Sequence, residues 1–114
     1  MPYVKLQTNK DIAEEKREDF SLEISKVVAE ALKKPESYVM TAVEPNISMS
    51  FAGSCKPAVF MELKSIGLSD SETKLISEKL CVFIQGKLDI NKDRVYIEFA
   101  SAAGSMWGWK GSTF

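Results

Sequence analysis

The chain of 114 residues contains no histidine, so it lacks the side chain that most often acts as a base near neutral pH and most often ligates metals. Its only cysteines are Cys55 and Cys81, which are too few for a zinc cluster or a disulfide framework within one chain and favour a reducing compartment. We expect no metal and no other cofactor. Any acid–base chemistry must then use a different group.

The sequence also lacks a long apolar run and a block of basic residues. Residues 1–5 lack the apolar core of a signal peptide. Polar and apolar residues alternate at this start of the chain, which does not suit a transmembrane helix. Fifteen basic and sixteen acidic residues give a net charge of −1, which disfavours nucleic acids and anionic membranes as partners. We predict a protein that is made and folded in the cytoplasm without membrane insertion, and export without a signal peptide stays open.

Apolar periodicity predicts two similar halves within a single domain, residues 1–114. The first helix is predicted to end near Lys33; Asp11 with Glu14 is typical of a capping box at its start, but Ser21 is equally suited to cap a shorter helix. A second helix is predicted from the capping box Ser69–Glu72 to a stop near Gly86. Strands are predicted at Tyr3–Thr8, Tyr38–Val43, Ala58–Ile66 and Arg94–Ala100.

Each half is therefore a βαβ unit, and residues 91–94 before the last strand correspond to residues 33–36 in the first half. Two such units predict an α/β (α+β) fold, with a four-stranded mixed sheet and both helices on one face. The strands are apolar enough that a bare sheet would expose a large hydrophobic face, which predicts self-association. An open sheet with a polar outer face is the alternative.

Several short segments follow one another in a characteristic order along nearly the whole chain. They are Met1-Pro2, Lys34-Pro35 with Tyr38-Val39-Met40, Met49-Ser50-Phe51 leading to Gly53-Ser54, Ser65-Ile66-Gly67, Asp93 to Ile97, and Trp107-Gly108-Trp109 before Gly111 to Phe114. In this order and spacing they resemble the macrophage migration inhibitory factor and D-dopachrome tautomerase family. The resemblance implies a homotrimer whose three sheets enclose a central channel, with the helices outside and the active sites between subunits.

By this resemblance the catalytic base is the amine of Pro2, exposed by removal of Met1. An α-amino group has an ordinary pKa of about 7.7 to 8.0, and burial or a nearby cation lowers it, so this amine is suited to replace the missing histidine. Taken alone, Pro2 is more typical of the start of an edge strand, where its missing N–H does no harm.

The resemblance also implies the residues that bind substrate. Lys34 would hold a carboxylate, Ser65 and Ile66 would contribute backbone groups and an apolar wall, and the neighbouring subunit would contribute Tyr96 and Glu98. The aromatic pocket would be formed by Tyr38, Trp107, Trp109 and Phe114, of which the last three lie in a Gly- and Ser-rich segment that suits a core poorly.

The implied activity is that of a keto–enol tautomerase, an isomerase acting on a small aromatic keto acid such as phenylpyruvate. Two alternatives are a secreted, cytokine-like protein that binds a cell-surface receptor and a trimeric scaffold with little catalysis.

Three positions depart from better-known members of this family. Glu98 replaces a neutral Asn and would oppose the effect of Lys34 on Pro2. Ala58 and Met61 replace a Cys-x-x-Cys pair, which disfavours thiol–disulfide activity.

A further departure concerns receptor recognition. The basic residue that some members use to engage a chemokine receptor has no counterpart at Asp11 or Ile12.

Overall fold

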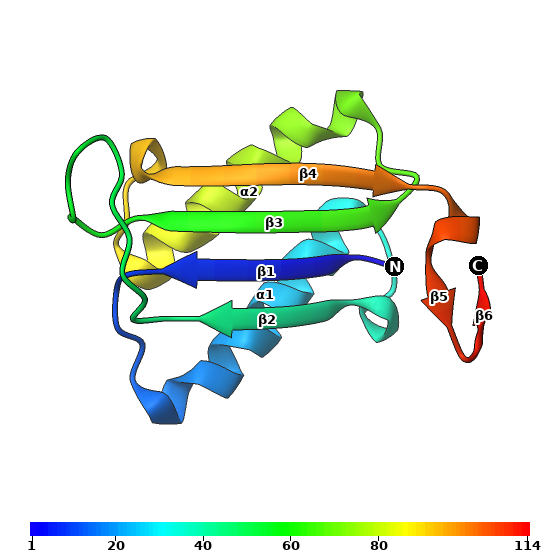
Figure 1. Cartoon of the computed structure of the whole chain (residues 1–114), viewed down its shortest axis with the longest axis horizontal. Coiled ribbons are helices and arrows are strands. Elements are labelled where there is room, and N and C mark those ends of the chain that lie inside the picture. Colours follow the sequence, from blue (N-terminus) through cyan, green and yellow to red (C-terminus); the bar gives the residue numbers. More distant parts are fainter.

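A four-stranded sheet covered on one face by two helices organises the computed structural model, which describes residues 1–114 (Figure 1). Short 3-10 turns (η) precede α1, β2, β4 and β5. The elements are β1 (Tyr3–Thr8), η1 (Glu14–Lys16), α1 (Arg17–Leu32), η2 (Glu36–Tyr38), β2 (Met40–Glu44), β3 (Val59–Ile66), α2 (Asp70–Leu88), η3 (Lys92–Arg94), β4 (Val95–Ala102), η4 (Gly104–Met106), β5 (Gly108–Trp109) and β6 (Ser112–Thr113).

The sheet has the strand order β2-β1-β3-β4 and confirms the prediction of two βαβ units. β1 and β2 are parallel, β3 and β4 are parallel, and the two units meet where β1 pairs with β3 in antiparallel fashion. Tyr3 lies opposite Met40 on one side and Lys64 on the other, and Lys64 in turn lies opposite Ala100. This register fixes which residues share each end of the sheet.

The core fills the space between the sheet and the two helices. Alternate residues of β1 and β3 are buried because successive side chains of a strand point to opposite faces. The helices bury residues three or four positions apart, as expected for amphipathic helices. The fully buried apolar side chains include Val4, Leu6, Met61, Leu63, Ile24, Val28, Leu80 and Ile84.

The sheet face opposite the helices differs in part from the sequence-based prediction. Between the apolar side chains it carries Lys5, Gln7 and Glu44, which bond to one another: the Lys5–Glu44 ion pair measures 3.3 Å, and Gln7 donates to Glu44 at 3.0 Å. Glu62 and Lys64 on β3 form a further ion pair at 4.0 Å. The open face is therefore mixed, because it combines these polar side chains with exposed apolar ones such as Met40 and Tyr96. It matches the predicted hydrophobic face and the polar alternative only in part.

The start of α1 also differs from both predicted caps. Neither Asp11 nor Ser21 caps the helix, which begins at Arg17 without a side-chain cap. Asp11 instead accepts from Arg17 at 3.4 Å, and the Ser21 hydroxyl donates to the carbonyl of Glu18 inside the helix at 2.8 Å. Arg17 donates to the carbonyl of Ile12 at 2.8 Å, which ties the preceding chain to the start of the helix without capping it.

The capping box of α2 is confirmed: the N–H of Ser71 donates to the hydroxyl of Ser69 at 3.2 Å, and the N–H of Ser69 donates to Glu72 at 3.0 Å. The helix ends at Leu88, two residues beyond the predicted stop at Gly86, because Leu88 is buried in the core and Asp89 takes the left-handed conformation at φ 55°.

The second strand is shorter than predicted at its start. Tyr38 lies in η2, where its N–H donates to the carbonyl of Pro35 at 3.1 Å, and strand pairing begins at Met40. η2 and η3 occupy equivalent places in the two halves, so Pro35 corresponds to Asn91 rather than to Asp93 as the predicted alignment had it.

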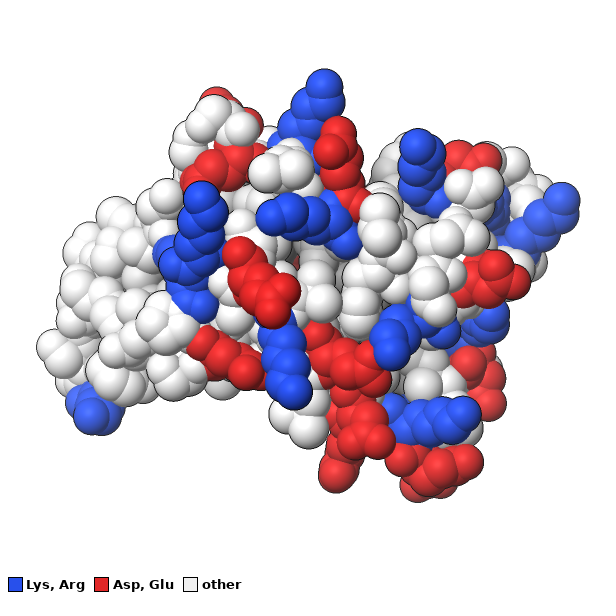
Figure 2. Space-filling view, turned by 180° about the vertical axis from the view of Figure 1, so that it is seen from behind, with Lys and Arg blue, Asp and Glu red and all other residues white.

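Charged side chains of both signs are mixed over the helix-covered face, whereas the end formed by the C-terminal hairpin is nearly free of them (Figure 2). Lys110 is the one charged residue after Glu98. Neither helix combines the length and the apolar character needed to cross a bilayer.

Candidate active site

A cavity of about 230 Å³ lies at the end of the sheet where β1 begins. Pro2 is buried there, and its carbonyl accepts the N–H of Met40 at 3.0 Å, which holds the start of β1 against β2. The cavity is lined by Met1, Pro2, Tyr3, Ser37, Tyr38, Val39, Met40, Trp107, Gly108, Trp109 and Phe114. Its lining thus brings the predicted base and all four predicted pocket aromatics together.

The aromatic wall of this cavity is a stacked cluster. The rings of Trp109 and Phe114 are nearly parallel, with centroids 5.3 Å apart, and Tyr38 meets both edge-on at 5.7 and 6.2 Å. These separations are those of favourable aromatic pairs. The wall joins η2 to the C-terminal hairpin and leaves flat apolar surface beside Pro2, which suits an aryl ring.

Lys34 reaches the same end of the molecule because α1 ends in a tight left-handed turn. Lys33 adopts φ 55°, and the chain then turns so that the Lys34 amine donates to the Ser65 hydroxyl at 3.1 Å and to the carbonyl of Ile66 at 2.7 Å. Ser65 is completely buried on the helix side of β3, so its side chain orients Lys34. The contact of Ser65 with substrate stays a prediction, and within the chain its hydroxyl is occupied by Lys34.

The terminal amine and Lys34 influence each other electrostatically. Partial burial, and to a smaller extent the positive charge of Lys34, lower the pKa of the Met1 amine below its ordinary value of 8.0. Both causes disfavour the charged form of an amine. This end of the chain therefore favours a neutral nitrogen, which is the form that can accept a proton.

Tyr96 and Glu98 lie far from this cavity within the chain. Tyr96 lies level with Phe60 and Gln7, whereas Pro2 precedes Tyr3 at the opposite end of β1. From Pro2 to the level of Tyr96 is five residues along a strand and two strands across, which correspond to roughly 17 Å and about 10 Å. One chain alone thus brings Pro2 and the aromatic wall into one cavity. Lys34 lowers the pKa of the terminal amine by its charge but does not line this cavity. Both residues expected from a neighbouring subunit are left out.

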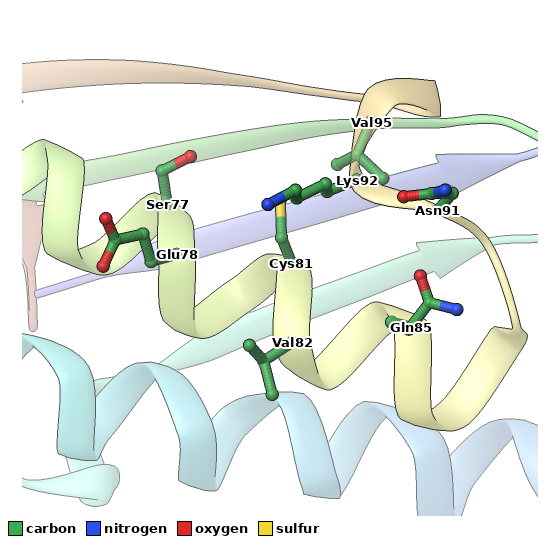
Figure 3. Close-up of a pocket in the computed structure, with 8 residues that line it drawn as sticks. All are labelled: Ser77, Glu78, Cys81, Val82, Gln85, Asn91, Lys92 and Val95. Atoms are coloured by element: carbon green, nitrogen blue, oxygen red, sulfur yellow. The ribbon is translucent and has the colours of Figure 1, made fainter.

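The largest cavity, about 670 Å³, lies elsewhere, between α2 and the start of β4 (Figure 3). It is lined mostly by polar side chains, among them Ser77, Gln85 and Lys92, around Cys81. Burial raises the pKa of the Cys81 thiol, so the reactive thiolate is disfavoured there. This cavity offers no neutral base beside an anion-binding group, and we place the candidate site at Pro2 instead. The prediction that Cys81 is buried packing was only partly right, because the residue is half-buried.

Sequence reasoning missed the hairpin that supports the aromatic wall. Trp109 pairs with Ser112 across a two-residue turn in which Lys110 and Gly111 have φ values of 54° and 75°. A glycine between two short polar and aromatic runs is typical of such a turn and was the available signal. Gly104 was also missed: the backbone oxygen of Phe114 lies 2.8 Å from where a Cβ of residue 104 would be.

Replacing Gly104 by Ala should displace Phe114 from the aromatic wall, because the added methyl group overlaps that oxygen. We expect an aryl acid to bind about fivefold more weakly, since one aromatic contact is lost. Titration of tryptophan fluorescence measures this. Gly86→Ala is the matched control, because nothing lies within 4 Å of its Cβ position. Unchanged affinity in Gly104→Ala would show that Phe114 does not contact the ligand.

Comparison with known proteins shows what the chain is similar to. A family model described as "Macrophage migration inhibitory factor (MIF)" matches residues 1–114. A macrophage migration inhibitory factor homolog from Trichinella spiralis is 40% identical over the full length of both chains, and the macrophage migration inhibitory factor of Rattus norvegicus is 35% identical over 85% of each. The crystal structure of the homologue from Prochlorococcus marinus aligns with a TM-score of 0.89 at 38% identity, covering 98% of each chain.

Proposed function

Because the chain belongs to the macrophage migration inhibitory factor family, within the tautomerase superfamily, we propose that it is a keto–enol tautomerase whose base is the amine of Pro2 after removal of Met1. The proposed substrate is a small aromatic keto acid such as phenylpyruvate, and the proposed active unit is a homotrimer. Family membership by itself supports a tautomerase or cytokine-like function in general terms.

The observation that carries this proposal is the terminal amine beside Lys34 at the aromatic cavity. Enolisation moves a proton from the carbon next to the ketone to the ketone oxygen, so the site needs a base that is neutral near pH 7. The causes that lower the pKa of the Met1 amine, burial and Lys34, act on the Pro2 amine as well, because Pro2 is buried one residue further in. The pyrrolidine ring holds that nitrogen in one direction.

Lys34 is suited to hold the carboxylate of the keto acid. A lysine ammonium has three N–H donors, and Ser65 and Ile66 accept two of them. The third is then available to a substrate carboxylate, in a charge-assisted hydrogen bond. The aryl ring of the substrate would lie against Trp109 and Phe114.

The trimer completes the site in this proposal. Tyr96 and Glu98 are too far from Pro2 to serve the cavity of their own chain, so each would serve the cavity of a neighbour. Three sheets would then surround a central channel with the helices outside. The open face, with its ion pairs, is compatible with a water-filled channel because its charged groups keep contact with solvent.

The proposal is tested first with the purified protein. An intact-mass measurement establishes that Met1 has been removed, and the absorbance of the enol then follows the interconversion of phenylpyruvate. We expect a rate well above that of buffer. A processed, folded protein that does not exceed the buffer rate would overturn the proposed activity.

Replacing Lys34 by Met should lower kcat/KM for phenylpyruvate by about 30-fold, because a charge-assisted hydrogen bond is lost. Activity requires the neutral amine, so it rises with pH through the amine pKa; without the Lys34 charge this pKa rises, and the rise in activity moves to higher pH. A pH–rate profile measures both effects. Lys33→Met is the matched control, because Lys33 is exposed and makes no side-chain contact to Ser65 or Ile66. Equal profiles for the two variants would remove Lys34 from the mechanism.

A second candidate function, favoured by the names of the animal relatives, is receptor binding after export without a signal peptide. In this case the chain is made in the cytoplasm and acts outside the cell. Binding to cells that survives the substitution of Pro2 would support it, and a chain that stays inside its cell of origin would contradict it. A protein with neither activity would fit the scaffold alternative.

A further inference from the structure

The ring of Tyr96 rests against one aromatic side chain, that of Phe51. The two ring centroids are 4.6 Å apart, at an interplanar angle of 38°. Tyr96 is otherwise 63% exposed on the open face of the sheet. Phe51 lies in the connection between β2 and β3, residues 45–58, which we call the Phe51 loop.

Arg94 holds the Phe51 loop by bonding to its backbone. Its guanidinium donates to the carbonyls of Phe51 and Lys56, both at 2.8 Å, and more weakly to those of Ser54 at 3.4 Å and Pro57 at 3.3 Å. The Cζ atom of Arg94 also lies 5.0 Å from the centroid of the Phe51 ring, within the range of a cation–π contact. One side chain thus fixes both the backbone and the ring of Phe51.

Two further features leave the loop little freedom. The amide of Asn9 donates to the carbonyls of Cys55 and Lys56, each at 3.1 Å, and accepts the N–H of Ala58 at 2.9 Å. Phe51 and Ser54 exchange backbone hydrogen bonds at 2.9 and 3.0 Å across a tight turn with positive φ at residues 52 and 53. A loop tied by this many bonds keeps the Phe51 ring in one place.

We propose that Phe51 and Arg94 are positioning residues that hold Tyr96 in the orientation in which it meets the substrate. The inference rests on the proposed function, in which Tyr96 completes a neighbour's site. An exposed tyrosine loses side-chain freedom when a ligand fixes it, and a ring already held by Phe51 loses less. The effect is therefore on substrate binding, with Arg94 acting on Tyr96 through Phe51.

Steady-state kinetics on the full-length, processed protein test the inference. Phe51→Leu removes the ring and should raise KM for phenylpyruvate about fivefold, with kcat within about twofold, because only binding is affected. Arg94→Lys keeps the charge but cannot reach four carbonyls and should do the same. Phe51→Tyr keeps the ring and should restore the wild-type KM. Ser50→Ala, at an exposed position of the same loop, is the control.

The decisive comparison repeats Phe51→Leu in a Tyr96→Ala background. If Phe51 acts through Tyr96, the second substitution should change KM no further. A fivefold rise in both backgrounds would overturn the inference and leave the proposed function standing. Sedimentation of each variant confirms an assembly state equal to that of the wild type. A wild-type protein without tautomerase activity would overturn the proposed function, and the inference with it.

Nuclear magnetic resonance of the Tyr96 ring keeps the inference testable even if Arg94→Lys folds poorly. The chain has three tyrosines, so the ring signals of ¹³C-labelled tyrosine are few, and the loss of one signal in Tyr96→Phe assigns that residue. The Tyr96 ring signals should shift and broaden in Phe51→Leu and stay in place in Ser50→Ala. Signals that do not move in Phe51→Leu would overturn the inference.

Discussion

Replacing Pro2 by Gly should lower the rate of phenylpyruvate tautomerisation by about 100-fold, at the lower end of what a positioned general base contributes. The variant still has a terminal amine, so the loss is not complete. What it lacks is the ring that fixes the direction of the nitrogen, and a base that swings freely spends little time in the reactive geometry.

The fold should survive this substitution. The one backbone hydrogen bond recorded for Pro2 uses its carbonyl, which accepts from Met40, and glycine keeps that group. Met1 is removed before glycine as it is before proline, so the two proteins carry matched N-termini, which an intact-mass measurement verifies. Circular dichroism and sedimentation should be unchanged. Equal rates for the two proteins would exclude Pro2 as the base.

Much of the fold was predictable because local signals agreed with tertiary packing. The capping box at Ser69 and Glu72 and the strands β1 and β3 were predicted from the sequence and were confirmed. The start of α1 was not readable, because it depends on how Arg17 reaches back to Ile12 rather than on a side-chain cap. The ion pairs of the open face were not predictable, because the pairing of Lys5 and Gln7 with Glu44 depends on the register between β1 and β2.

The candidate site was predictable only in part, and the reason lies in long-range geometry. Lys34 and Ser65 are 31 residues apart, and the sequence does not reveal that a buried hydroxyl orients the lysine. The link from Arg94 to Phe51 spans 43 residues and joins a strand start to a loop. Such partners lie on different elements and are brought together only by the packing of the whole fold.

The case for a trimer changes once the open face is known to be mixed. A hydrophobic face would require a cover, but a face with charged and paired side chains tolerates water. The remaining structural argument is the divided site: Pro2 and Lys34 lie at one end of the chain, and Tyr96 at the other. In the proposed trimer, assembly would complete the active site more than it would stabilise the sheet, so the experiment must detect sites that are shared between subunits.

Mixing two inactive variants should restore activity if each site uses two subunits. Pro2→Gly lacks the positioned base, and Tyr96→Asp replaces an aryl contact by a carboxylate that repels an anionic keto acid; each alone should retain roughly 1% of the wild-type rate. In a random mixture of equal amounts, about one site in four combines an intact Pro2 from one chain with an intact Tyr96 from its neighbour, as a head-to-tail ring allows.

The two variants are unfolded together and refolded, and each is also refolded alone as the control. We expect the mixture to recover about a quarter of the wild-type rate, because one site in four is intact. Sites contained within single chains would give only the average of the two variants, near 1%, since no chain of the mixture carries both residues. Sedimentation of the mixture decides the number of subunits, and recovery in a species other than a trimer would keep the shared site but contradict the proposed assembly.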